Sequence, residues 1–158
     1  MNQLKDGGNL IFIRHAYAPG SGDPANFNLN DCSTQRNLND EGREQAKYIG
    51  EFFKKNKIKI DKVLSSEWCR CKETAKIAFK NFSTNSFLNS FYSFKYAKNK
   101  EKQIEMLNDY VKKFKSNQNL IFVTHYVLIS EVLNYAPSSG EIVVSDKNFN
   151  IIGTIEIN

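Results

Sequence analysis

Two seven-residue segments of this chain are nearly identical, and they constrain its fold more than any other feature. Residues 9–15 read NLIFIRH and residues 119–125 read NLIFVTH. In each segment an unbroken apolar run, typical of a strand buried on both faces of a parallel sheet, leads directly to a histidine. If the two strands are neighbours in one sheet, His15 and His125, the only histidines of the chain, lie together at the same edge.

The remaining residues alternate between helix and strand patterns. Apart from the strands within the two segments above, a strand is predicted at 60–64 and helices at 40–56, 67–82, 104–114 and 126–135. Residues 83–96 predict one short strand and a loop, and residues 141–157 predict two edge strands joined by a hairpin. Strands that alternate with helices form a largely parallel sheet covered on both faces. We therefore expect an α/β fold of three layers in one domain, residues 1–158.

The charge of the chain is mildly basic, with 22 Lys and Arg against 17 Asp and Glu. The lysines are mixed with acids on or beside predicted helices, which favours solvated helix faces over a nucleic-acid patch. Such a body suits a small anionic substrate. No apolar run reaches the length of a membrane span, and the first residues carry no secretion signal. We expect a cytoplasmic protein with no membrane partner, and export after removal of a signal peptide stays open.

The three cysteines, Cys32, Cys69 and Cys71, predict neither a zinc site nor a catalytic loop. They are one short of a four-cysteine zinc site, and none begins the C-x5-R loop of cysteine-dependent phosphatases. We expect no metal and no cofactor. Reduced thiols are the default, and a disulfide between Cys32 and either Cys69 or Cys71 is expected only in an exported protein.

Two arginines accompany the histidines at the predicted sheet edge. Arg14 directly precedes His15, and Arg70 lies in the first turn of a helix that follows a strand. A guanidinium binds phosphate oxygens in pairs, and a neutral imidazole is a competent phosphoryl acceptor. Neighbouring positive charge lowers the pKa of a histidine and keeps its ring neutral. The set therefore indicates phosphoryl chemistry, and the long polar segment 16–38 is expected to be its active-site loop.

Several motifs together resemble the histidine phosphatase superfamily, whose fold is phosphoglycerate mutase-like. These motifs are RHA at 14–16, NLNDEGREQA at 37–46, SSEWCRCKETA at 65–75 and TH at 124–125. More closely, GDPANF, DCSTQRNL, LNSF and SGEIVV look like a small, uncharacterised bacterial branch of that superfamily. The resemblance implies that His15 is the phosphorylated nucleophile and that Arg14, Arg70 and His125 form the phosphate pocket.

The resemblance also points to the polar loop for substrate binding. Ser21 stands where many members carry an asparagine that contacts phosphate, and backbone N–H groups of Ser21 and Gly22 are candidates for that contact. A plain flexible turn is the alternative. Arg36 is a candidate for a second anionic group, with a salt bridge at the start of the next helix as the alternative.

The general acid departs from the superfamily pattern. Many members place a glutamate in an L-x-E segment or an aspartate after the second histidine, whereas this chain has Ser90 and Tyr126 there. Four acids remain as substitutes, although each is also expected as a surface or capping residue. They are Asp23, Asp31, Glu67 and Glu141.

These observations predict a metal-independent phosphatase that works through phosphohistidine at His15. Without an evident acid it should favour good leaving groups. Its substrate is expected to be a small phosphorylated molecule or a phosphoprotein, and its oligomeric state stays open. The alternatives are a catalytically weak phosphate-binding or regulatory member of the same fold and, less favoured, a nucleic-acid binder.

Overall fold

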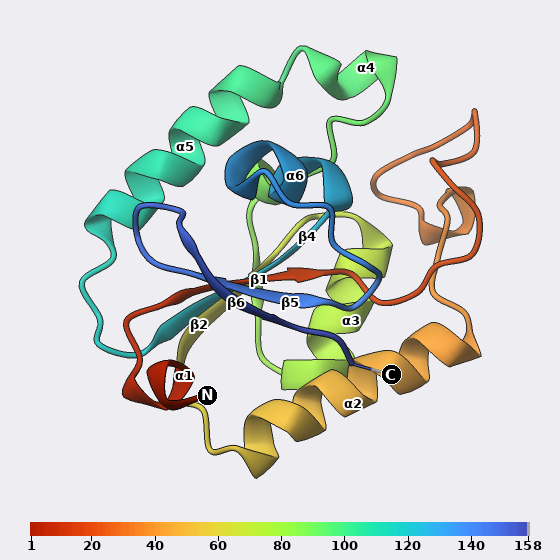
Figure 1. Ribbon diagram of the computed structural model, residues 1–158. Helices are drawn as coiled ribbons and strands as arrows, with labels where there is room; N and C mark the ends of the chain where they lie inside the picture. Colours follow the sequence, from red (N-terminus) through yellow and green to blue (C-terminus); the bar gives the residue numbers. More distant parts are fainter. Residues whose placement is uncertain (158) are drawn as a thin grey trace.

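A six-stranded mixed sheet forms the centre of the protein, whose computed structural model describes residues 1–157. The strand order is β3-β2-β4-β1-β5-β6 (Figure 1). The four strands β3, β2, β4 and β1 run parallel, and β5 and β6 run antiparallel to their neighbours. The bounds are β1 Leu10–Arg14, β2 Ile60–Ser65, β3 Ser83–Thr84, β4 Asn119–Thr124, β5 Ile142–Ser145 and β6 Ile151–Ile155.

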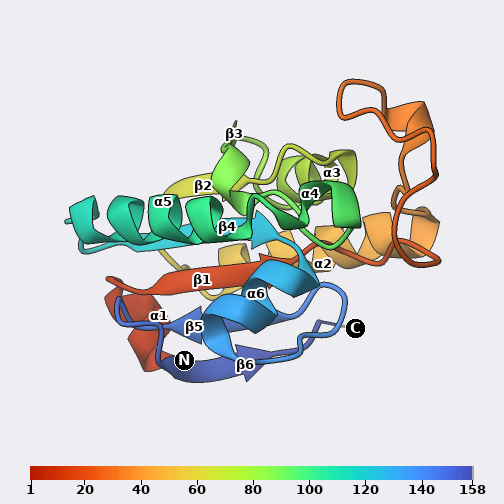
Figure 2. The same cartoon turned by 90° about the horizontal axis from the view of Figure 1, so that it is seen from above.

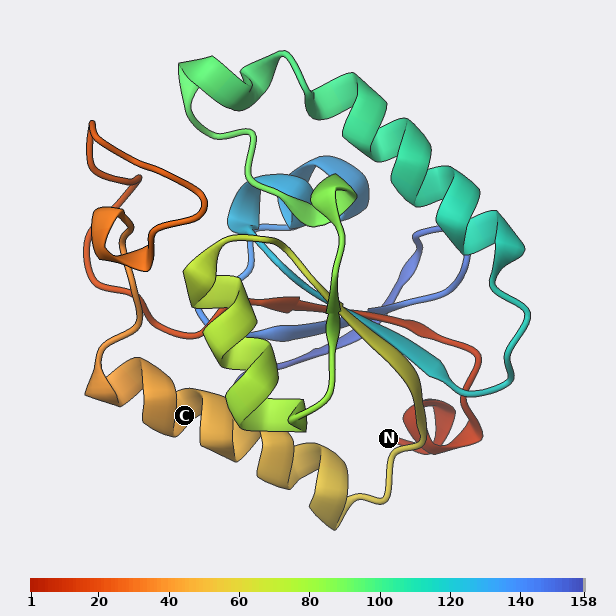
Figure 3. The ribbon, with the colours of Figure 1, turned by 180° about the vertical axis from the view of Figure 1, so that it is seen from behind.

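Helices cover both faces of the sheet and confirm the three-layer α/β prediction (Figures 1 and 3). Helices α2 and α3 pack on one face, and α5 and α6 pack on the other. The helices are α1 Asn2–Asp6, α2 Asp40–Lys55, α3 Cys69–Phe79, α4 Phe94–Ala97, α5 Lys100–Lys113 and α6 Tyr126–Leu133. The sequence did not predict α1 or α4, because helices this short carry little periodicity.

The two matching segments are adjacent parallel strands, so the condition for bringing His15 and His125 to one edge is met. β1 pairs with β4 so that Arg14 lies opposite Thr124. Along β1, Phe12 packs into the core beneath α5 and α6, and Ile13 packs into the core beneath α2 and α3. Because side chains alternate between two buried faces, the strand needs apolar residues at every position.

The hairpin prediction is wrong for one of its two strands. β5 lies between β1 and β6, and all four of its residues are buried, so only β6 is at the edge. Its continuous apolar run is typical of such an interior strand.

The polar segment between β1 and α2 stands beyond the carboxyl ends of the parallel strands (Figure 2). Ligands in open α/β sheets bind at that edge. In the part of the chain that the structure describes, no helix has the length and apolar composition needed to cross a membrane.

Candidate active site

The His15 imidazole is buried at the carboxyl end of β1, with 2% of its surface exposed. Its Nδ1 lies 2.9 Å from the Ala16 carbonyl oxygen, which can only accept, so Nδ1 carries the proton. Burial, and then the positive charge of Arg70, lowers the pKa of His15 well below its usual value. The ring is therefore neutral, with an unprotonated Nε2.

Arg70 lies in the first turn of α3 and points at that nitrogen. Its Nε donates to His15 Nε2 at 3.2 Å, and 3% of its surface is exposed. Both the guanidinium and the free N–H groups of a helix N-terminus attract an anion. The unprotonated nitrogen of His15 and a buried guanidinium are thus in direct contact.

His125 follows β4 and faces His15, with ring centroids 5.6 Å apart. The two histidines meet at one sheet edge, as the sequence predicted. His125 Nε2 lies 2.8 Å from the Ser66 hydroxyl, which fixes the orientation of the ring. Burial lowers the pKa of His125 well below its usual value, and Arg70 and His15 act in the same direction.

Arg14 is a further positively charged residue that lines the pocket. Its Nη1 donates to the Pro137 carbonyl at 2.9 Å, and its guanidinium carbon lies 5.3 Å from the centre of the Tyr126 ring. Among the described residues, its buried Nε has no hydrogen-bond partner. A buried donor without a partner is costly, and a bound anion would satisfy it.

Thr74, four residues after Arg70 in the SSEWCRCKETA motif, links two segments of the site. Its hydroxyl donates to the Arg70 carbonyl at 2.8 Å and accepts from the Ala16 amide at 3.0 Å. One side chain therefore ties the segment that carries the nucleophile to the helix that carries Arg70.

Ser21, Gly22 and Arg36 also line the pocket. The Nε of Arg36 donates to the Gly22 carbonyl at 2.7 Å, and its Nη1 donates to the Ala18 carbonyl. Arg36 thus holds the loop together from within, in place of the salt bridge considered from the sequence. Phosphate binding by the amides of Ser21 and Gly22 stays a prediction.

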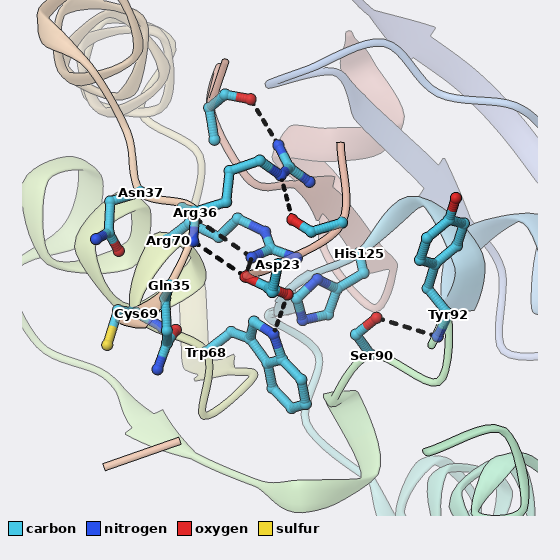
Figure 4. A network of polar contacts seen from close by, with 12 residues as sticks. Asp23, Gln35, Arg36, Asn37, Trp68, Cys69, Arg70, Ser90, Tyr92 and His125 are labelled. Carbon is cyan, nitrogen blue, oxygen red and sulfur yellow. Dashed lines mark hydrogen bonds and ion pairs between the residues drawn. The ribbon is translucent and has the colours of Figure 1, made fainter. Parts of the chain in front are cut away.

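Asp23 is the one substitute acid that the structure brings into the pocket. Its Oδ1 accepts from Arg70 Nη1 at 2.8 Å and from the Arg36 amide at 3.0 Å. Its Oδ2 accepts from Trp68 Nε1 at 3.0 Å. Figure 4 shows the Asp23 carboxylate between the Arg70 guanidinium and the Trp68 indole.

The other three substitute acids lie outside the pocket lining. Asp31 is exposed and accepts from the Ser33 amide at 3.0 Å. Glu67 accepts from Asn89 Nδ2 at 2.8 Å, and the buried Glu141 accepts from the Tyr135 hydroxyl. Asp31 matches the expected capping role, whereas the burial of Glu141 contradicts the expectation of a surface position.

An aromatic wall, absent from the sequence-based site, lines part of the pocket. The pocket volume is about 650 Å³, within the range of sites for drug-sized ligands. Two rings of the wall are largely free, since Tyr92 is 66% exposed and Phe94 98% exposed. The run FYSFKY at 91–96 was the available signal. The wall consists of Phe27, Trp68, Tyr92, Phe94, Tyr96 and Tyr126.

A disulfide joins Cys32 to Cys69, so the default expectation of reduced thiols is wrong for these two residues. The pairing could not be read from the sequence, because only the path of the polar loop brings Cys32 to the start of α3. Cys71 is free and buried, and burial raises its pKa to about 12.

Comparison with known families finds one match at the sequence level. The family model of the histidine phosphatase superfamily (branch 1) matches residues 10–88, which include His15 and Arg70. The mitochondrial serine/threonine-protein phosphatase Pgam5 of Drosophila virilis is 36% identical over 73 residues, or 46% of this chain and 22% of that protein. Pgam5 of Drosophila willistoni is 34% identical over 76 residues, or 48% and 23%. The chain thus spans less than a quarter of the length of these curated relatives.

Solved structures share the fold. Phosphoglycerate mutase from Thermus thermophilus superposes with a TM-score of 0.61 at 15% identity, covering 95% of this chain and 99% of that chain. The protein histidine phosphatase SixA complexed with tungstate gives a TM-score of 0.59 at 15% identity, with 93% and 96% covered. The architecture is therefore phosphoglycerate mutase-like.

Proposed function

Because the chain belongs to the histidine phosphatase superfamily (branch 1), we propose that it hydrolyses phosphorylated substrates through a phosphohistidine intermediate at His15. The observation that carries the proposal is the contact between His15 and Arg70. A neutral imidazole presents an unprotonated Nε2 to a buried guanidinium at 3.2 Å. A phosphoryl group placed between them would meet the nucleophile and a cationic ligand together.

The roles of the other pocket residues follow from their positions. Arg14 and His125 would contact the remaining phosphoryl oxygens, since both lie at the same edge of the sheet as His15. Charged donors in a buried pocket are worth more than in water, because the surroundings screen them less. The proposed reaction uses no metal and no cofactor.

The substrate is proposed at the level of a class. With Ser90 and Tyr126 at the usual donor positions, esters with good leaving groups should react fastest unless another carboxyl reaches the leaving oxygen. The aromatic wall suits a flat apolar leaving group, such as a phenol or an aromatic side chain of a phosphoprotein. Pgam5 and SixA carry the names of protein phosphatases, which supports phosphoproteins as candidates.

The test is His15→Ala assayed on an aryl phosphate. We expect turnover to disappear, and acid-labile phosphate to be trapped on the wild type during turnover but not on the variant. Tyr48→Ala, which changes an exposed residue of α2 outside the pocket, serves as the control. Full activity in His15→Ala would overturn the mechanism.

A catalytically weak phosphate-binding protein is the second candidate. Ser90 and Tyr126 at the usual acid positions favour it, because a pocket without a proton donor could bind phosphate and still catalyse poorly. This candidate predicts that wild-type protein binds phosphate or vanadate but does not turn over an activated aryl phosphate.

A further inference from the structure

Asp23 is the only acidic residue among the described residues that line the pocket. The exposed fraction of its side chain is 17%, so the carboxylate faces the pocket interior more than bulk solvent. It comes from the polar loop, whereas superfamily members usually supply their acid from other segments. Its position therefore bears on the missing proton donor.

Asp23 is held in place by three hydrogen bonds from different segments. Arg70 comes from α3, the Arg36 amide from the loop and the Trp68 indole from the turn before α3. All three partners donate, so both oxygens of the Asp23 side chain act as acceptors in this arrangement.

A bound phosphate ester would change the surroundings of the Asp23 carboxylate in two ways. The phosphoryl oxygens compete with Asp23 for the Arg70 guanidinium, so the ionised carboxylate loses its cationic partner. The same oxygens bring negative charge beside it and repel the carboxylate. Binding of the substrate would thus favour uptake of a proton by Asp23, and the leaving group needs that proton.

We propose that Asp23 is the general acid and base of the phosphatase reaction. In the first step His15 Nε2 forms a bond to phosphorus, and the bond from phosphorus to the leaving oxygen breaks. The electron pair goes to that oxygen, which takes the Asp23 proton and departs as an alcohol or phenol. In the second step the Asp23 carboxylate takes a proton from water as the water oxygen attacks phosphorus. The bond to His15 then breaks, which releases inorganic phosphate and restores both side chains.

The competing explanation is that Asp23 is only a resident anion that substrate must displace. The two roles predict opposite effects of removing the charge. Loss of a proton donor slows the departure of a basic leaving group, whereas loss of a competing anion strengthens phosphate binding and speeds every substrate.

The experiment compares Asp23→Asn with wild type on phenyl phosphate and on dinitrophenyl phosphate, whose leaving group needs no proton. We expect kcat/KM for phenyl phosphate to fall by about 10²- to 10⁴-fold, with kcat/KM for dinitrophenyl phosphate within a few fold of wild type. With dinitrophenyl phosphate, phosphohistidine should accumulate in the variant, because the second step loses its base while the first step is nearly unaffected. Asp31→Asn, the same change at an exposed position of the same loop, should leave both substrates unaffected.

Three outcomes would overturn the assignment. Faster turnover of both substrates with tighter phosphate inhibition would make Asp23 a competing anion. An equal loss on both substrates would make it a positioning residue. A selective loss of phenyl phosphate turnover in Glu67→Gln, and not in Asp23→Asn, would identify Glu67 as the general acid.

The inference rests on the proposed function, and trapping of phosphate keeps the two separate. If wild type forms no phosphohistidine from dinitrophenyl phosphate, the proposed function fails. If both proteins form it and the two esters respond alike to Asp23→Asn, only the role of Asp23 fails. A thermal melt of Asp23→Asn that matches wild type shows that the loss is chemical.

Discussion

The Arg70 guanidinium holds two groups that a phosphoryl group would separate. Its Nε donates to the His15 imidazole, and its Nη1 donates to the Asp23 carboxylate. The contact with His15 is buried and the contact with Asp23 is partly buried, so water screens both less than it would at the surface. Arg70 therefore contacts both the proposed nucleophile and the proposed acid.

Replacing Arg70 with alanine should weaken the binding of phosphate and vanadate by roughly 2 to 4 kcal/mol, because it removes one charged partner of a largely desolvated anion. The inhibition constant of vanadate measures the effect. Arg43→Ala is the matched control, since that arginine lies in α2 and its salt bridges are exposed. An inhibition constant unchanged in Arg70→Ala would place the residue outside the phosphate site.

The two buried histidines make stability depend on pH. Their pKa values are lowered in the folded protein, mainly by burial, whereas unfolded histidine has a pKa of about 6.5. Below that pH the unfolded state binds more protons, so the free energy of unfolding falls as pH falls, until the folded pKa values are reached.

The expected slope is up to about 1.4 kcal/mol per pH unit for each histidine. Urea unfolding at several values between about pH 6.5 and 5 tests this, above the range where most carboxylates titrate. His15→Gln should roughly halve the slope. A free energy of unfolding that stays constant over this range would show that the folded histidines take up protons freely.

At the scale of elements, α2 is fixed against the segment that follows the nucleophile. A Cβ atom at Gly42 would lie 2.0 Å from the Tyr17 carbonyl oxygen, so only glycine permits this approach. The Asn39 side chain caps the same turn by accepting from the Gly42 amide at 2.9 Å. The start of α2 therefore sets the path of the chain just after His15.

Gly42→Ala should destabilise the protein by about 1 to 3 kcal/mol, although alanine in a helix interior is normally preferred to glycine. The forced shift of Tyr17 should also lower kcat. Urea midpoints and an aryl phosphate assay measure the two effects. Gly153→Ala in β6 is the control, since a Cβ there meets nothing within 4 Å. A variant as stable as wild type would show that α2 can move away without cost.

The elements that the sequence predicted are those with a strong local pattern. The unbroken apolar runs of β1 and β4 and the periodicity of α2 and α5 gave their positions to within a few residues. The interior position of β5 was missed because a hairpin was expected to lie at an edge. Its pairing with β1 depends on a contact distant in sequence, which local patterns do not reveal.

For the whole molecule, local sequence patterns predicted four site residues but not the position of Asp23, which depends on contacts distant in sequence. His15, Arg14, Arg70 and His125 follow from strand ends, because carboxyl ends of parallel strands share one edge. Asp23 could not be distinguished from Asp31, Glu67 or Glu141 in the sequence. Its position depends on how the polar loop folds back on the protein, where the Trp68 indole and the Arg36 amide donate hydrogen bonds to its carboxylate.

The Cys32–Cys69 disulfide closes a loop across 37 positions and joins that polar loop to α3 beside Arg70. Cys32→Ser should lower the free energy of unfolding by about 2 to 4 kcal/mol and raise KM, because the loop that carries Asp23 loses its covalent tie. Urea unfolding and kinetics with and without dithiothreitol measure both. Reduced wild type should match the variant, and the variant itself should not respond to the reductant.

Oxidation of Cys69, the residue directly before Arg70, would then be a condition for assembling the active site. The polar loop and the start of α3 form two walls of the pocket, and the disulfide joins them. The thiol–disulfide balance of the surroundings would therefore set the fraction of protein with a complete active site. If wild type with three titratable thiols keeps its full kcat/KM, noncovalent contacts alone hold the walls together. If activity falls with the bond and returns on reoxidation, the protein reports the redox state of its compartment through the rate at which it releases phosphate.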